Sequence, residues 1–76
     1  MNTIAAPTMT ETLGTALPKE MARVRDKLLP IYDSIPTGVF AATMMRADLD
    51  RAAKAMVEGD TVEMLRIYEA LKGYKA

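Results

Sequence analysis

The segment Val57-Glu58-Gly59-Asp60-Thr61-Val62-Glu63 ends one helical pattern and begins another, so it decides how this chain folds. Glycine adopts left-handed backbone angles without strain, and Gly59 is therefore expected to cap the C-terminus of a helix. Asp60 is followed three residues later by Glu63, which is the spacing of a capping box at the start of the next helix. Because so short a turn reverses the chain abruptly, the two helices are predicted to pack antiparallel.

Upstream of this turn, apolar residues recur at the three- and four-residue steps of a helix. This helix is predicted to begin at Ser34 or Thr37, both of which are favourable N-terminal caps, and to end at Glu58. Its apolar stripe consists of Ala42, Met45, Leu49, Ala52 and Met56. Its polar side carries Arg46, Asp50, Lys54 and Glu58.

Downstream of the turn, a second apolar stripe consists of Met64, Leu65, Tyr68 and Leu71. Gly73 follows this stripe and is predicted to end the helix.

A further helix is predicted to begin near Pro18, because proline is favourable in a first helical turn. Pro30 lies inside this helix, where it lacks an amide hydrogen and its ring crowds the carbonyl of Asp26. It also disfavours helical angles at Leu29, so we expect a kink or a break there. The apolar stripe of this helix consists of Met21, Val24, Leu28, Ile31 and Ile35.

Residues 1–16 show no sustained apolar period and contain Pro7 and Gly14, so they are predicted to form a flexible N-terminal tail. Residues 17–76 are predicted to form one helical domain. The expected fold class is therefore all-α: a small helical hairpin or three-helix bundle with a kinked first helix behind a flexible tail.

Composition excludes several classes of function. The 76 residues include no cysteine and no histidine, so disulfides, a zinc site and the commonest general base are not expected. With no phosphate-binding glycine loop either, we expect no enzyme activity, no cofactor and no metal. No stretch is long and apolar enough for a membrane span, and no signal-peptide pattern opens the chain, so a cytoplasmic protein is expected. A chain of this size has a marginal core, for which association with a partner is a common remedy.

The strongest functional indication is the uncharged run Val39-Phe40-Ala41-Ala42-Thr43-Met44-Met45. A surface helix should carry polar residues on one side over this length, so the run is either enclosed on all sides or lies at an interface. We expect a protein partner to bind Val39, Phe40, Ala41 and Met44. The alternative is that Met44 and Met45 are both ordinary core residues.

Basic residues in the first helix indicate a second possible surface. Lys19, Arg23 and Lys27 are four residues apart and so share one side of the helix, where they could follow a phosphate backbone. Glu20 and Asp26 dilute this charge, and the ten basic residues of the chain are balanced by ten acidic ones. Nucleic acid is therefore not the partner we expect first.

These patterns favour a non-enzymatic protein–protein interaction factor: a small accessory, regulatory or inhibitory protein that acts by occupying a surface. Its partner is either another protein or a second copy of the chain in a homodimer. The alternatives are a nucleic-acid-associated protein that uses the basic side of the first helix, and a structural subunit of a larger assembly.

Overall fold

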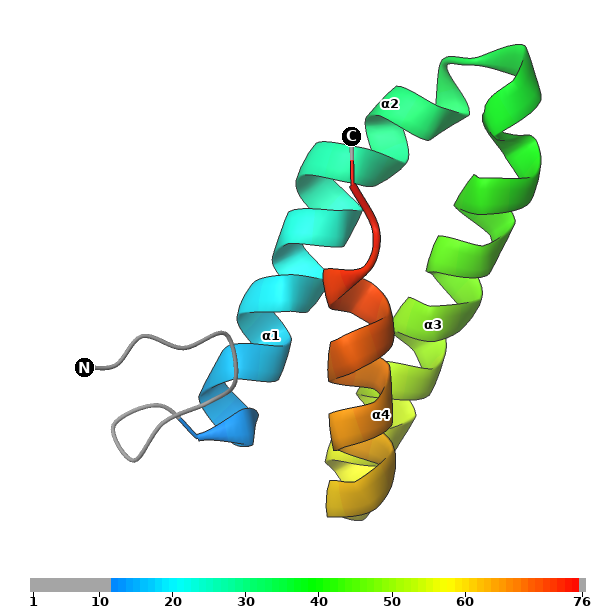
Figure 1. Ribbon diagram of the computed structural model, residues 1–76. Helices are drawn as coiled ribbons and strands as arrows, with labels where there is room; N and C mark the ends of the chain where they lie inside the picture. Colours follow the sequence, from blue (N-terminus) through cyan, green and yellow to red (C-terminus); the bar gives the residue numbers. More distant parts are fainter. Residues whose placement is uncertain (1–11, 76) are drawn as a thin grey trace.

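The computed structural model describes residues 12–75, all of whose regular structure is helical (Figure 1). The elements in chain order are α1 (Leu13–Arg23), the π-helical turn η1 (Val24–Leu28), α2 (Leu29–Asp33), the 3₁₀ turn η2 (Pro36–Gly38), α3 (Val39–Glu58) and α4 (Thr61–Lys72). The prediction of a small all-α bundle is confirmed. The part of the predicted tail that precedes residue 12 lies outside the described residues.

The rods of the bundle are formed by α1 to α2, by α3 and by α4 (Figure 1). The first is continuous through α1, η1 and α2, and the chain then reverses so that α3 runs back alongside it. A second reversal at Gly59–Asp60 brings α4 antiparallel to α3, where α4 also packs on α1. The core between the rods is formed by Ala16, Leu17, Val24, Leu28, Leu29, Ala42, Met45, Ala52, Ala55, Met64, Ile67, Tyr68 and Leu71.

The first helix begins earlier than predicted. It starts at Leu13, so Pro18 lies inside it rather than in its first turn, and residues 13–16 are helical instead of belonging to the tail. Leu17 is fully buried and Ala16 nearly so, while Leu13 packs against the core. Burial of these side chains stabilises a turn that proline disfavours locally. Pro18 has no amide hydrogen for the carbonyl of Gly14, but Gly14 is exposed and water can bind there.

Pro30 does not break the helix. The backbone of Leu29 has φ −53° and ψ −45°, so this residue stays helical. The irregularity lies upstream, in the π turn η1, where the amide of Leu29 donates to the carbonyl of Val24, five residues earlier. Such a wider turn is one way for a helix to accommodate a residue that cannot donate to its usual partner.

The second predicted helix starts later than expected. Neither Ser34 nor Thr37 caps it: α3 begins at Val39 after η2, with Gly38 at the cap position. The hydroxyl of Ser34 instead donates to the carbonyl of Ile31 over 2.7 Å, at the end of α2. Gly38 is buried because the carbonyl of Tyr32 approaches it closely, which leaves no room for a side chain.

The turn between α3 and α4 is as predicted. Gly59 has the left-handed angles φ 67° and ψ 28°, and the carboxylate of Asp60 accepts a hydrogen bond from the amide of Glu63 over 3.1 Å. The Glu63 carboxylate does not complete the capping box, because it binds Arg51 across the turn. Farther along α4, the predicted stripe is wrong at one position, since Ile67 is buried and Leu65 is exposed.

Candidate interaction surface

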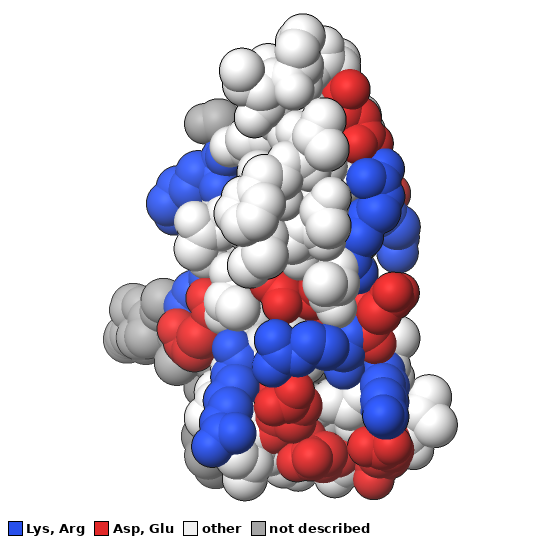
Figure 2. Space-filling model, turned by 90° about the vertical axis from the view of Figure 1, so that its right-hand side faces the viewer, with Lys and Arg blue, Asp and Glu red and all other residues white. Residues whose placement is uncertain are grey.

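Large apolar side chains lie exposed at the end of the bundle where α2 passes into α3. Phe40 is 77% exposed, Val39 65% and Met44 45%. Ile31 and Ile35, which the sequence pattern placed on the core stripe of the first helix, are exposed at the same end. We call these five residues the apical patch. Figure 2 views the side of the molecule formed by α3, where uncharged side chains occupy the middle of the upper half and charged side chains lie along its edges.

The structure separates the two interpretations of the uncharged run. Met45 is buried in the core, whereas Met44, the next residue, is exposed. Ala41 is half-buried between these two environments. Val39, Phe40 and Met44 are thus exposed, and Ala41 is only partly exposed.

Thr43 adds to this surface without adding an unsatisfied polar group. It is exposed, and its hydroxyl donates to the carbonyl of Val39 over 2.9 Å. A partner that covers Thr43 therefore does not have to replace a hydrogen bond with water, which is the main cost of covering a hydroxyl. The ion pair between Arg46 and Asp33 also lies on exposed side chains, one from α3 and one from α2.

The basic residues predicted as a phosphate-binding row differ in their surroundings. The Arg23 guanidinium donates to the carbonyl of Leu71 over 2.9 Å and lies 2.9 Å from the Glu20 carboxylate, so it joins α1 to the end of α4. Lys27 is exposed and Lys19 is exposed four residues before Arg23. Since the middle cation of the row is half-buried and bound within the bundle, the row is interrupted.

A second cation of this helix is also paired. Arg25 binds the neighbouring Asp26 through two hydrogen bonds of 2.8 and 3.0 Å. These bonds hold the pKa of the Asp26 carboxyl below its usual value. The carboxylate thus stays ionised and reduces the net charge that a phosphate would meet on this side of α1 and η1.

Sequence reasoning missed a buried carboxylate. Asp48 on α3 is 7% exposed, accepts a 2.7 Å hydrogen bond from the Tyr74 hydroxyl and lies 3.2 Å from the Arg51 guanidinium. Burial, followed by the hydrogen bond to Asp48, raises the pKa of Tyr74 to about 12. The hydroxyl of Tyr32 on α2 donates to the carbonyl of Lys75. The residues after α4 therefore join α2 to α3, and we call Gly73–Lys75 the C-terminal clasp.

The signal for this clasp was present but weak. Asp48 lies three residues after Met45 and one before Leu49, both of which belong to the apolar stripe, and an acid at such a position calls for a donor. The donor that reaches Asp48 depends on where α4 ends relative to α3, and the sequence does not determine that position.

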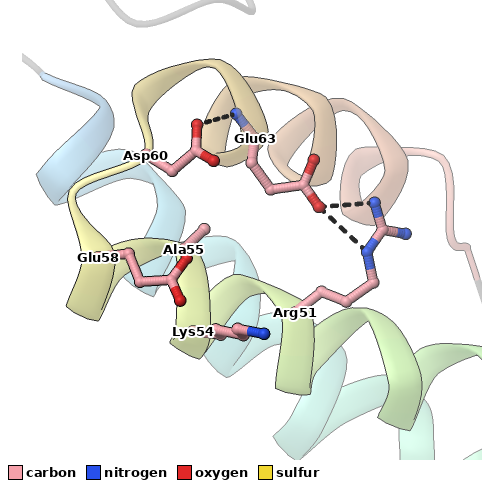
Figure 3. A pocket seen from close by; sticks show the side chains of 6 residues that line it. All are labelled: Arg51, Lys54, Ala55, Glu58, Asp60 and Glu63. Carbon is pink, nitrogen blue, oxygen red and sulfur yellow. Dashed lines mark hydrogen bonds and ion pairs between the residues drawn. The ribbon is translucent and has the colours of Figure 1, made fainter.

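A charged pocket of about 230 Å³ lies beside the turn between α3 and α4 (Figure 3). It is lined by Arg51, Lys54, Ala55, Glu58, Asp60 and Glu63. The Arg51 guanidinium donates to Glu63 over 2.9 and 3.2 Å, and these contacts raise the pKa of Arg51. Arg51, Asp60 and Glu63 are thus already engaged in joining α3 to α4. Among residues 12–75, no group of three acidic side chains has the arrangement of a metal site.

No protein-family model, no curated protein and no solved structure matches this chain. Within the described residues, no helix has the length and apolar character needed to cross a membrane.

Proposed function

We propose that this chain is a non-enzymatic protein–protein interaction factor that binds its partner through the apical patch. It acts as a small accessory, regulatory or inhibitory protein, by occupying a surface of that partner. The exposure of Phe40 carries the proposal. An exposed aromatic ring among other exposed apolar side chains is the kind of group that dominates binding energy in protein interfaces.

A contrast along α3 supports this assignment. Phe40 and Met44 point away from the core on the N-terminal half of the helix, and Asp50 and Lys54 are exposed on its C-terminal half. Solvent exposure alone favours charged residues on both halves. Large exposed apolar side chains thus gather in the N-terminal half of α3, and Val57 is the one such residue in its C-terminal half.

Matched substitutions on one helix test the proposal. Phe40→Ser removes the exposed ring, and Val57→Ser removes a side chain that is 88% exposed near the other end of α3. Both residues are exposed, so both variants should keep the helical content of the wild type. Affinity-tagged wild type and variants are used to capture proteins from the source cells, with mass-spectrometric identification and quantification.

We expect Phe40→Ser to lose a protein that both the wild type and Val57→Ser retain, whether that protein is another chain or an untagged copy of this one. Equal capture by all three would refute binding through the apical patch. A nucleic-acid function would instead appear as a gel shift whose affinity falls steeply with salt and does not depend on Phe40.

A further inference from the structure

The segment from α2 to η2 contributes little to the core. It comprises residues 29–38, and we call it the α2–η2 segment. Leu29 is the one buried residue of α2, and Tyr32 packs against the core while part of its surface stays exposed. The buried residue of η2 is Gly38, which has no side chain. Because α3 and α4 each contribute four residues to the buried core, the segment is held less strongly by apolar packing than either of them.

The backbone is irregular where this segment begins. In the π turn η1, the amide of Leu29 donates to the carbonyl of Val24, five residues earlier. The next residue, Pro30, has no amide hydrogen for the carbonyl of Asp26. Two successive residues therefore depart from the usual hydrogen-bond pattern of a helix. Since π turns and prolines are common positions for helix bending, this turn can act as a hinge between α1 and the segment.

A polar contact from the C-terminal clasp holds the segment against the bundle. The Tyr32 hydroxyl on α2 donates to the carbonyl of Lys75 in the clasp. The clasp is itself fixed to α3, because the Tyr74 hydroxyl donates to the buried Asp48 carboxylate over 2.7 Å. The exposed ion pair that joins α2 to α3 adds little, since solvent screens it. The polar hold on the segment therefore passes mainly through the clasp.

We propose that the C-terminal clasp is a latch for the α2–η2 segment. While Tyr74 is bound to Asp48, the carbonyl of Lys75 stays within reach of Tyr32 and the segment stays closed. When the clasp leaves α3, the segment opens about η1 and the rest of the bundle remains folded. Openings of this kind occur in segments with few buried apolar contacts, at free energies below that of global unfolding.

The latch acts on the apical patch. Ile31 and Ile35 lie on the α2–η2 segment, whereas Val39, Phe40 and Met44 lie on α3. Opening of the segment therefore separates the first two residues of the patch from the other three. This consequence for binding rests on the proposed function, whereas the opening itself is measured without a partner, so the two can fail separately.

Amide hydrogen exchange of the full chain, followed by NMR spectroscopy, measures this opening. The amides of Ile35 and Gly38 report on the segment, because each donates to a backbone carbonyl within it. The slowest amides of α3 and α4 report on unfolding of the whole bundle. Tyr74→Phe keeps the aromatic ring and removes the hydroxyl that holds the clasp. It should accelerate exchange at Ile35 and Gly38 about fivefold, which is the effect of one lost hydrogen bond.

Asp60→Ala is the matched control, because it removes one hydrogen bond at the other end of the bundle. Opening of the segment leaves that cap intact, so exchange at Ile35 and Gly38 should stay at the wild-type rate. The slowest amides of α3 and α4 should exchange about fivefold faster, because global unfolding breaks the cap. Equal acceleration of both sets of amides would show that the segment opens only when the whole bundle unfolds, and would overturn the proposal.

A second variant tests the link between the clasp and the segment. Tyr32→Phe removes the hydrogen bond to Lys75, so it should also accelerate exchange at Ile35 and Gly38 about fivefold. With this link gone, the further change Tyr74→Phe should produce no additional acceleration at these amides. No effect of Tyr74→Phe alone, or additive effects of the two changes, would show that the clasp does not latch the segment through Tyr32.

Discussion

The close approach of α2 to the start of α3 makes Gly38→Ala a demanding test of the fold. A Cβ atom at Gly38 would lie 2.2 Å from the carbonyl oxygen of Tyr32 and 3.0 Å from its carbonyl carbon. Both are backbone atoms, so no side-chain rotation relieves the collision. Alanine at this position therefore forces α2 and the start of α3 to move apart, although only a short segment connects them.

The magnitude follows from that distance. Carbon–oxygen contacts are ordinarily about 3.3 Å or longer, so the backbones must separate by roughly 1 Å. Overpacking of this kind costs about 1–3 kcal/mol, and a backbone collision belongs at the upper end. A domain of this length has a total stability on the order of 5 kcal/mol. The expected loss therefore lowers the thermal midpoint by roughly 10–20 °C.

Gly59→Ala is the matched control for this measurement. Gly59 has φ +67° and open space around its Cα, so alanine there meets only the strain of left-handed angles, about 1–2 kcal/mol. Both variants make the same change in the unfolded chain, so that contribution cancels. Thermal and urea unfolding followed by circular dichroism give the two losses. If Gly38→Ala costs no more than Gly59→Ala, the tight contact between α2 and α3 is refuted.

Three further outcomes are expected. Gly14→Ala should raise the free energy of unfolding by about 0.5–1 kcal/mol in thermal unfolding, because Gly14 is helical and the new Cβ would lie an ordinary 3.7 Å from Thr12. No change in stability would indicate that this segment is not helical. Asp60→Ala should lower the free energy of unfolding in urea by about 1 kcal/mol, because it removes the hydrogen bond to the Glu63 amide. An unchanged value would mean that Asp60 does not cap α4. The folded state raises the pKa of Tyr74 to about 12. The stability that the protonated Tyr74 hydroxyl contributes is therefore fully present below a pH of about 10 and is lost as the pH rises to about 12. The free energy of unfolding should fall faster over this pH range for the wild type than for Tyr74→Phe. The same pH dependence in both proteins would contradict the hydrogen bond from Tyr74 to Asp48.

What could be predicted from the sequence is what local chemistry determines. The left-handed angles of Gly59 and the cap at Asp60 depend on residues within one turn of the chain, and both were predicted correctly. Exposure of Phe40 and Met44 was also predicted, because a run without charges is too wide for one core-facing stripe. These features need no knowledge of which helix packs where.

Several of the errors involve a contact between distant segments. The sequence pattern placed residues 13–16 in the tail, because their helical structure depends on packing against the rest of the bundle. Ile67 and Leu65 differ by two positions on α4, and the rotation of α4 against its neighbours decides which of them is buried. The clasp contact of Tyr74 with Asp48 joins residues 26 positions apart. Periodicity gives a face for each helix but not the angle at which two faces meet.

The lengths of the helices explain why the apical end of the bundle is thinly supported. With a rise of about 1.5 Å per residue, the 20 residues of α3 extend about 30 Å and the 12 residues of α4 about 18 Å. Because α4 starts at the C-terminal end of α3, it ends before it reaches the N-terminal half (Figure 1). There α3 packs on α2 without a third helix, and the clasp adds the hydrogen bonds of the Tyr32 and Tyr74 hydroxyls and the packing of the Tyr74 ring. A partner bound to the apical patch would add apolar burial to this thinly supported half, so binding at the apical patch and stability of the apical end should be coupled.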